Sequence, residues 1–461
     1  MADNTVIVVQ TYGPLKTDQS GARTDACAGA TTGRSSIVAT TAEANPRSVL
    51  QRNSSRLCVV AQSLVEPRPA VQRQPRASRA SVLGAGSLAL THAVNDSYAY
   101  ILPPLLPVLL TQAGLTLGMG AALVAIQQLA SAFLQPLCGH WADRTGEGRW
   151  MAWAGVLLSG LGAAALGLVP GFGGLGVAML ATGIGSALFH PVSAALVAQA
   201  APPAQRGFWM SAYISAGNLG LGIGPLLIGL VLVGGSVQST WLLGIPALIA
   251  AILTGVLSPI RPGRRGAQHL SLLGVLRGNW RILAALIGVV ALRSWASTTL
   301  VTFLPTLATE RGAEPTQAAQ VLTVFLITGA IGGFAGGAAA DRFGRDQVVI
   351  GSLLLSVPFG VFLALYPQFD VLFWLAAGAC GFFLNGSWVS LTVRGQESVP
   401  GSIAMMSGLM LGLSIGLGGI AVTPFGLIAE RFGLPAVLAA TAALPALGAA
   451  LMRLVPRPAA T

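Results

Sequence analysis

Two stretches of this chain, 198 residues apart, carry nearly the same residues in the same order. Every identity holds at one constant offset, without a gap. The matching residues are Leu106, Pro107, Leu109, Thr111, Gly114, Gly139, Ala142, Asp143, Arg144 and Gly146 in the first stretch, and Leu304, Pro305, Leu307, Thr309, Gly312, Gly337, Ala340, Asp341, Arg342 and Gly344 in the second. An internal repeat on this scale indicates that the fold was built by duplication.

Composition places this duplicated chain in a membrane. Of its 461 residues, 53% are hydrophobic and only 9% are charged, and its mean hydropathy is +0.72. A soluble domain usually carries about 25% charged residues. We therefore expect a polytopic helical membrane protein. A hydrophobic chain made of two similar halves is typical of a transporter with its site between them.

Apolar segments of about 20 residues, enough to cross a bilayer as a helix, follow one another from Val82 onward. The fold class predicted is an all-α membrane protein with twelve transmembrane helices in two pseudo-symmetric six-helix bundles. The predicted spans are 84–111, 117–140, 150–169, 173–200, 207–234 and 240–260 in the first half, and 282–307, 316–340, 348–367, 371–395, 402–427 and 434–455 in the second.

The predicted domains are a polar tail at 1–81, bundles at 82–260 and 282–461, and a basic linker at 261–281. The tail has no long apolar run, so we expect it to be disordered. Its Arg-rich, acid-poor composition leaves three readings open: an organellar transit peptide, a start assigned too far upstream, or a cytoplasmic tail.

The arginines predict the orientation in the membrane. Loops on the N-terminal side, the linker included, carry most of them, whereas the opposite loops carry only Arg311 and Arg431. By the positive-inside rule, both termini and the linker lie in the cytoplasm. The pI near 10.7 is then a signal of topology and not of nucleic-acid binding. We expect a multi-pass monomer in the cell inner membrane.

Two loops carry one signature. The segments that run from Gly139 through Asp143 and Arg144 to Gly146, and from Gly337 through Asp341 and Arg342 to Gly344 and Arg345, resemble the loop signature of the major facilitator superfamily. The resemblance implies a conformational latch that closes the cytoplasmic side and does not touch substrate. The residues predicted for this latch are Gly139, Asp143, Arg144, Gly337, Asp341, Arg342 and Arg345.

Finer resemblance is to the fosmidomycin resistance protein family, bacterial drug exporters of that superfamily, over about residues 84 to 455. The matching pieces are 92–96 with 105–107, 135–139, 183–191, 217–225, 292–294 with 303–305, and 396–400. Gly220, Gly224 and Pro225 also resemble the antiporter motif of the superfamily, which favours export; generic helix packing is the alternative.

Charged groups inside lipid are candidates for function by default. His92 and Asp96 lie four residues apart in the first span, so they share a helix face, and Asp96 is the best candidate for proton coupling, with His92 assisting. Each has a structural alternative, a plain interhelical hydrogen bond. The predicted substrate-binding residues are Arg293, His190, Asn95, Asn385 and Trp388. For Arg293 the alternative is a permanent salt bridge to Asp96, and for Trp388 it is plain packing.

The sequence thus predicts a secondary transporter that exports a small organic compound, driven by proton entry. An importer or facilitator of an organic acid or sugar, or a transport-dead sensor, are the alternatives. We expect no enzyme activity, because the chain has no nucleophile–base pair, metal cluster or nucleotide loop. The four cysteines, Cys27, Cys58, Cys138 and Cys380, show no metal or redox spacing, and we expect no cofactor.

Overall fold

A computed structural model describes residues 79–145, 148–202, 205–233, 236–258, 280–398 and 403–455. Within these ranges all regular secondary structure is helical. The predicted tail (1–81) and linker (261–281) lie outside the described residues, apart from 79–81 and 280–281. The side chain of Asp143 also lies outside them.

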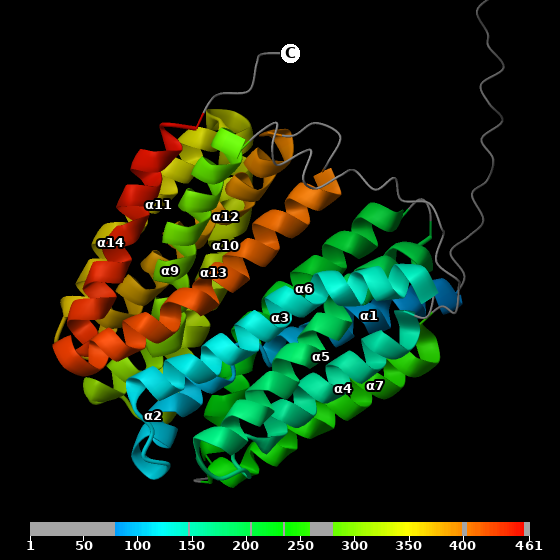
Figure 1. Ribbon diagram of the computed structural model, residues 1–461, viewed down its shortest axis with the longest axis horizontal. Helices are drawn as coiled ribbons and strands as arrows, with labels where there is room; N and C mark the ends of the chain where they lie inside the picture. Colours follow the sequence, from blue (N-terminus) through cyan, green and yellow to red (C-terminus); the bar gives the residue numbers. More distant parts are fainter. Residues whose placement is uncertain are drawn as a thin grey trace, which may run out of the picture. The chain divides into compact units, whose positions relative to one another are not determined.

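The first half contains six membrane crossings. The first crossing is split into two helices and the sixth opens with a 3-10 turn. The elements are α1 (Arg79–Ser97), α2 (Leu102–Gln112), α3 (Leu117–Thr145), α4 (Gly148–Ala165), α5 (Gly171–Ala200), α6 (Arg206–Val233), η2 (Val237–Leu243) and α7 (Gly244–Leu257). Figure 1 shows them in blue to green.

The second half repeats this pattern with six unbroken helices, shown from green through yellow to red in Figure 1. They are α9 (Trp280–Glu310), α10 (Pro315–Phe343), α11 (Arg345–Leu365), α12 (Val371–Ser398), α13 (Ile403–Phe432) and α14 (Leu434–Met452). Ten described helices are long and apolar enough to span a bilayer. The split helix α1–α2 and the short α4 complete the twelve-helix bundle.

Large apolar side chains face outward along the helices. Leu137, Val256 and Leu375 are each about two-thirds exposed. In water such surfaces would mark an interaction site, but on helices of this length they are the faces that contact lipid tails. The chain is a multi-pass membrane protein.

The predicted span 84–111 is interrupted between Ser97 and Leu102, because Pro103 and Pro104 open α2. A proline ring clashes with the carbonyl four residues earlier, so a helix cannot continue through the pair. A carbonyl freed at this break finds a partner elsewhere, since Gln127 Nε2 donates to the Tyr98 carbonyl at 3.2 Å. The Tyr98 hydroxyl donates to the Leu243 carbonyl at 2.7 Å.

The two halves meet through specific pairs of helices. α3 packs against α13, α6 packs against α10, and α2 packs against α9, and Figure 1 shows α3 crossing α13. In contrast, α1 packs against α5, α6 and α7 of its own half. We call the end of the bundles that carries the α3–α4 and α10–α11 loops the signature end. α2, the start of α3 and the end of α13 lie at the opposite end.

Candidate functional site

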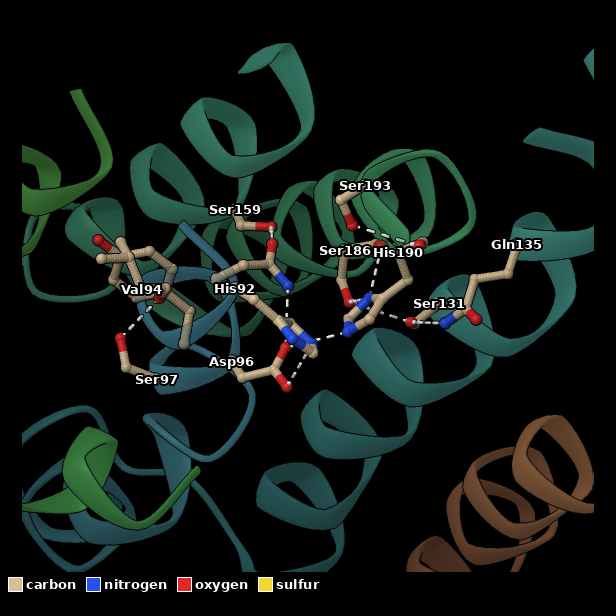
Figure 2. Close-up of polar contacts among 12 residues, drawn as sticks. His92, Val94, Asp96, Ser97, Ser131, Gln135, Ser159, Ser186, His190 and Ser193 are labelled. Carbon is tan, nitrogen blue, oxygen red and sulfur yellow. Dashed lines mark hydrogen bonds and ion pairs between the residues drawn. The ribbon is translucent and has the colours of Figure 1, made fainter. Parts of the chain in front are cut away.

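A cluster of three titratable side chains lies inside the first half. Asp96 on α1 is contacted by His92, one turn earlier, and by His190 on α5. His92 Nε2 lies 3.2 Å from Asp96 Oδ2, and His190 Nε2 lies 3.0 Å from Asp96 Oδ1. Figure 2 shows Asp96 linked to both histidines. We call these three residues the His–Asp–His triad.

The other ring nitrogen of each histidine is held by a backbone carbonyl. His92 Nδ1 lies 2.7 Å from the carbonyl oxygen of Tyr213 on α6, and its ring stacks on the Tyr213 ring with centroids 4.0 Å apart. His190 Nδ1 lies 2.9 Å from the carbonyl oxygen of Ser186, one turn earlier on α5. A carbonyl can only accept, so we assign a hydrogen to both Nδ1 atoms. The Ser186 hydroxyl, 3.1 Å from His190 Nδ1, then lies beside the same N–H.

This arrangement determines how many protons the triad needs. A neutral imidazole has a single N–H, so with Nδ1 protonated its Nε2 is a bare acceptor. Each Nε2 faces a carboxylate oxygen, which is also an acceptor. Each of the two contacts therefore needs one further proton to be a hydrogen bond. With both protons the triad carries a net charge of about +1, and with one proton it is neutral and one contact is lost.

Neutral groups support the carboxylate and extend the network. Asn95 Nδ2 donates to Asp96 Oδ1 at 3.1 Å, and Ser159 Oγ on α4 donates to Asn95 Oδ1 at 3.1 Å. From His190, contacts continue through Ser186 and Ser131 to Gln135 on α3 (Figure 2). The side chain of His190 is 29% exposed, against 9% for His92 and 12% for Asp96. His190 is therefore the most exposed member of the triad.

The three motif residues on α6 lie where this helix meets α1. A side-chain carbon added at Gly220 or Gly224 would collide with the backbone of α1, and one added at Gly217 would collide with the His92 ring. Pro225 is buried in the same helix. The missing side chains let the two helices come close enough for His92 to reach the Tyr213 carbonyl, which gives this stretch a packing role.

The second half buries a different group at a similar place. Arg293 on α9 is 4% exposed and donates from Nη2 to Asn385 Oδ1 on α12 at 2.7 Å. Its Nε contacts the Leu384 carbonyl and Ser387 Oγ, each at 3.3 Å. The guanidinium lies over the Trp388 ring, 4.6 Å from its centroid. The structure therefore brings together three predicted substrate-binding residues, Arg293, Asn385 and Trp388, whereas Asn95 and His190 lie with the triad.

These partners of Arg293 are all neutral. Among the described residues no carboxylate lies within 4.0 Å of the guanidinium, and Asp96 pairs with histidines instead. The predicted alternative, a salt bridge between Arg293 and Asp96, is therefore wrong for this state. Buried charges normally need an opposite charge, and no described residue supplies one to Arg293 within 4.0 Å.

The two loop signatures hold helices together within each half. A side-chain carbon at Gly139 would lie 3.3 Å from Pro191 of α5, and one at Gly337 would lie 3.6 Å from Val389 of α12. Arg144 is exposed, and Arg342 stacks on Phe343.

Ion pairs at the second signature also stay inside one half. Arg345 on α11 pairs with Glu397 on α12 at 2.7 Å and lies 4.0 Å from the exposed Asp341. Arg394 on α12 pairs with Asp346 on α11 at 2.8 Å. The proposed latch between halves remains a prediction.

The triad also has the donor set of a metal site, since one ligand atom from each residue lies within 4.8 Å of the others. The direct Nε2–oxygen contacts, however, are satisfied by protons alone. The prediction that the chain uses no metal stays a prediction.

Sequence reasoning missed the groups that orient these side chains. Tyr213 and Ser186 act through backbone carbonyls, which carry no residue-specific signal. Ser387 also contacts Arg293, but it lies two residues after Asn385, and side chains at that spacing do not share a helix face, so periodicity does not point to it.

A twelve-helix bundle of two duplicated halves, with polar groups buried in each, defines a membrane transporter. A sequence profile of the Major Facilitator Superfamily matches residues 88–297 and 286–461. The chain belongs to this superfamily, whose members are transporters and not enzymes.

Similar proteins support this assignment. The Fosmidomycin resistance protein of Escherichia coli (strain K12) is 29% identical over 373 residues, which cover 79% of this chain and 90% of that protein. The Uncharacterized MFS-type transporter YfnC of Bacillus subtilis (strain 168) is 31% identical over 379 residues, covering 78% and 90%. A bacterial homologue of the human lysosomal transporter Spinster, solved in an inward-facing and unoccupied conformation, superposes with a TM-score of 0.70 at 16% identity, covering 82% and 97%.

Proposed function

We propose that this chain exports a small organic compound in exchange for protons, by alternating access. The observation that carries the proposal is the proton requirement of the His–Asp–His triad. Its two Nε2–carboxylate contacts, at 3.0 and 3.2 Å, need two protons to be hydrogen bonds. Loss of one proton leaves an acceptor facing an acceptor, so the proton content and the geometry of the triad are linked.

Substrate binding is assigned to the second half. A buried guanidinium whose described partners are all neutral attracts an anion strongly, and its planar fork suits a carboxylate or phosphonate. Trp388 and Asn385 flank that guanidinium and would contact the rest of the compound. His190, the most exposed member of the triad, would be the member that responds to the bound anion.

Direction and compound class rest on resemblance. Gly220, Gly224 and Pro225 resemble an antiporter motif, and the printed name of the Escherichia coli relative concerns fosmidomycin resistance. Efflux of fosmidomycin or a similar drug is therefore the first activity to test. The arginine distribution supports cytoplasmic termini, and the bacterial relatives support an inner-membrane location. We expect a monomer to suffice.

The test uses the full-length chain in a bacterial host that lacks its major drug pumps. Growth is measured on fosmidomycin and on a panel of phosphonate and carboxylate compounds, with and without a protonophore. Export predicts that the chain raises the tolerated concentration and that the protonophore removes the effect. Greater sensitivity to a compound would indicate import, and an unchanged panel would contradict drug efflux.

Purified protein in proteoliposomes then tests coupling. A pH gradient is imposed across the vesicle membrane. If transport is proton-coupled exchange, protons should leave the acidic side through the protein and the compound should accumulate on that side against its own gradient. If the transport rate does not depend on the pH gradient, the protein acts as a facilitator and not as a proton antiporter.

A further inference from the structure

The contact of Glu430 with the start of α3 joins the two halves at the opposite end of the bundles. Glu430 lies near the end of α13, and its Oε1 accepts a hydrogen bond of 2.6 Å from the backbone N–H of Gly118. Gly118 is the second residue of α3, so this N–H belongs to the first turn and has no partner within its own helix. The positive end of the helix dipole favours a carboxylate there.

Close packing of two glycines positions this contact. A side-chain carbon at Gly118 would lie 2.9 Å from Glu430 Oε1, and one at Gly426 would lie 2.7 Å from the Ala121 side chain and 3.0 Å from the Leu117 carbonyl. The backbones of α3 and α13 therefore touch where the carboxylate reaches the N–H.

The duplicated half shows what is unusual here. At the matching end, α10 is capped from within its own segment, by Glu314 and Gln317 in a reciprocal capping box. Thr116 stands at the place equivalent to Glu314, and its hydroxyl accepts from the Met119 N–H at 3.2 Å. The first turn of α3 contains no acidic residue. Its carboxylate comes from the other half of the molecule instead.

We propose that Glu430 is a latch that holds the opposite end closed. In this state α3 and α13 are in contact and the first turn of α3 is capped. When the halves part at that end, the Gly118 N–H loses its acceptor, whereas the cap of α10 moves with α10 and is kept. The latch thus biases the equilibrium between the two access states, whatever the substrate or direction of transport.

Spin-label distance measurement on the full-length protein in nanodiscs tests the latch. The native cysteines are replaced, and labels are placed at the exposed Ala113 and Ala436, one in each half at the opposite end. Loss of a helix cap corresponds to roughly a three- to thirty-fold change in an equilibrium constant. Glu430→Ala should raise the ratio of long to short distances by that factor, and Glu430→Gln should raise it less.

Glu314→Ala is the matched control, because it removes the same kind of carboxylate cap from the duplicated half. It should leave the distance distribution unchanged. An unchanged distribution in Glu430→Ala, or an equal shift in Glu314→Ala, overturns the proposal. If Glu430→Ala does not fold, Glu430→Gln decides in the same way, with monodisperse size-exclusion profiles as the folding check. Failure of drug efflux would leave this outcome unaffected.

Discussion

The two halves bury charge in different ways. In the first half, Asp96 is surrounded by two histidines and an asparagine, so two imidazoles lie within ion-pair distance of its charge. In the second half, the described partners of Arg293 are an amide, a hydroxyl, a carbonyl and an indole ring. One centre pairs an acid with two imidazoles, and the other surrounds a cation with groups that, in the described part of the chain, are all neutral.

Duplication kept the positions and changed the chemistry. At the offset of 198 residues, Asn95 matches Arg293, Asp96 matches Ser294, and His190 matches Trp388. The backbone scaffold therefore supplies equivalent places, and single substitutions decide which polar group each place carries. The helix break also differs between equivalent places. Pro103 and Pro104 split the first crossing, whereas Val301 and Thr302 occupy the matching positions in α9, which is unbroken.

The largest effect is expected from Asp96→Asn. The amide keeps the shape of the carboxyl but cannot exchange a proton with the histidines, so pH-driven transport in proteoliposomes should be abolished. Exchange of labelled for unlabelled compound needs no coupling and should remain. Asp341→Asn is the same chemical change outside the triad and serves as the control. Full pH-driven transport in Asp96→Asn would falsify the assignment of the first half to protons.

Arg293→Gln should act on substrate affinity instead. Hydrogen bonds to charged groups contribute roughly 1.5–3 kcal/mol, so affinity for an anionic compound should fall by roughly 10- to 150-fold. Both exchange and pH-driven transport should weaken together. Arg293→Lys keeps the charge without the planar fork and should recover part of the affinity. If Arg293→Gln alters the pH response but not affinity, the two centres have been assigned the wrong way round.

Gly217→Ala should disturb the first centre without changing its chemistry. The added methyl group would collide with the His92 ring, and overpacking of this kind costs about 1–3 kcal/mol. We expect a lower melting temperature and several-fold slower transport. Gly351→Ala, on α11 where nothing lies within 4 Å of the added carbon, is the control. Equal melting temperatures for the two variants would contradict the tight α1–α6 contact.

The smallest effect is expected from Asp341→Asn. Asp341 is 79% exposed and 4.0 Å from Arg345, which already pairs with Glu397 at 2.7 Å. Exposed ion pairs contribute about 0.2–1 kcal/mol, so transport should change by less than about fivefold. Initial transport rates provide the measurement. Complete loss of transport would show that Asp341 does more than pair at the surface.

Much of the fold was predictable because its signals are local or repeated. The offset of 198 residues revealed the duplication, and the apolar runs marked the spans. The span 84–111 is predicted as one helix, whereas the structure breaks it before Pro103 and Pro104. This adjacent proline pair is a local signal from which the break was predictable. His92 and Asp96 were expected on one face because four residues separate them, and they are in contact.

The sequence by itself thus determined the class of protein, the halves and the short set of polar residues inside them. Only the tertiary structure decided which of these residues meet: His190 with Asp96, Arg293 with Asn385, and Glu430 with the Gly118 N–H. These helices are apolar nearly all round, so periodicity does not reveal their rotation. Pairs more than 90 residues apart depend on helix rotation and crossing, which glycines at the contacts set through packing.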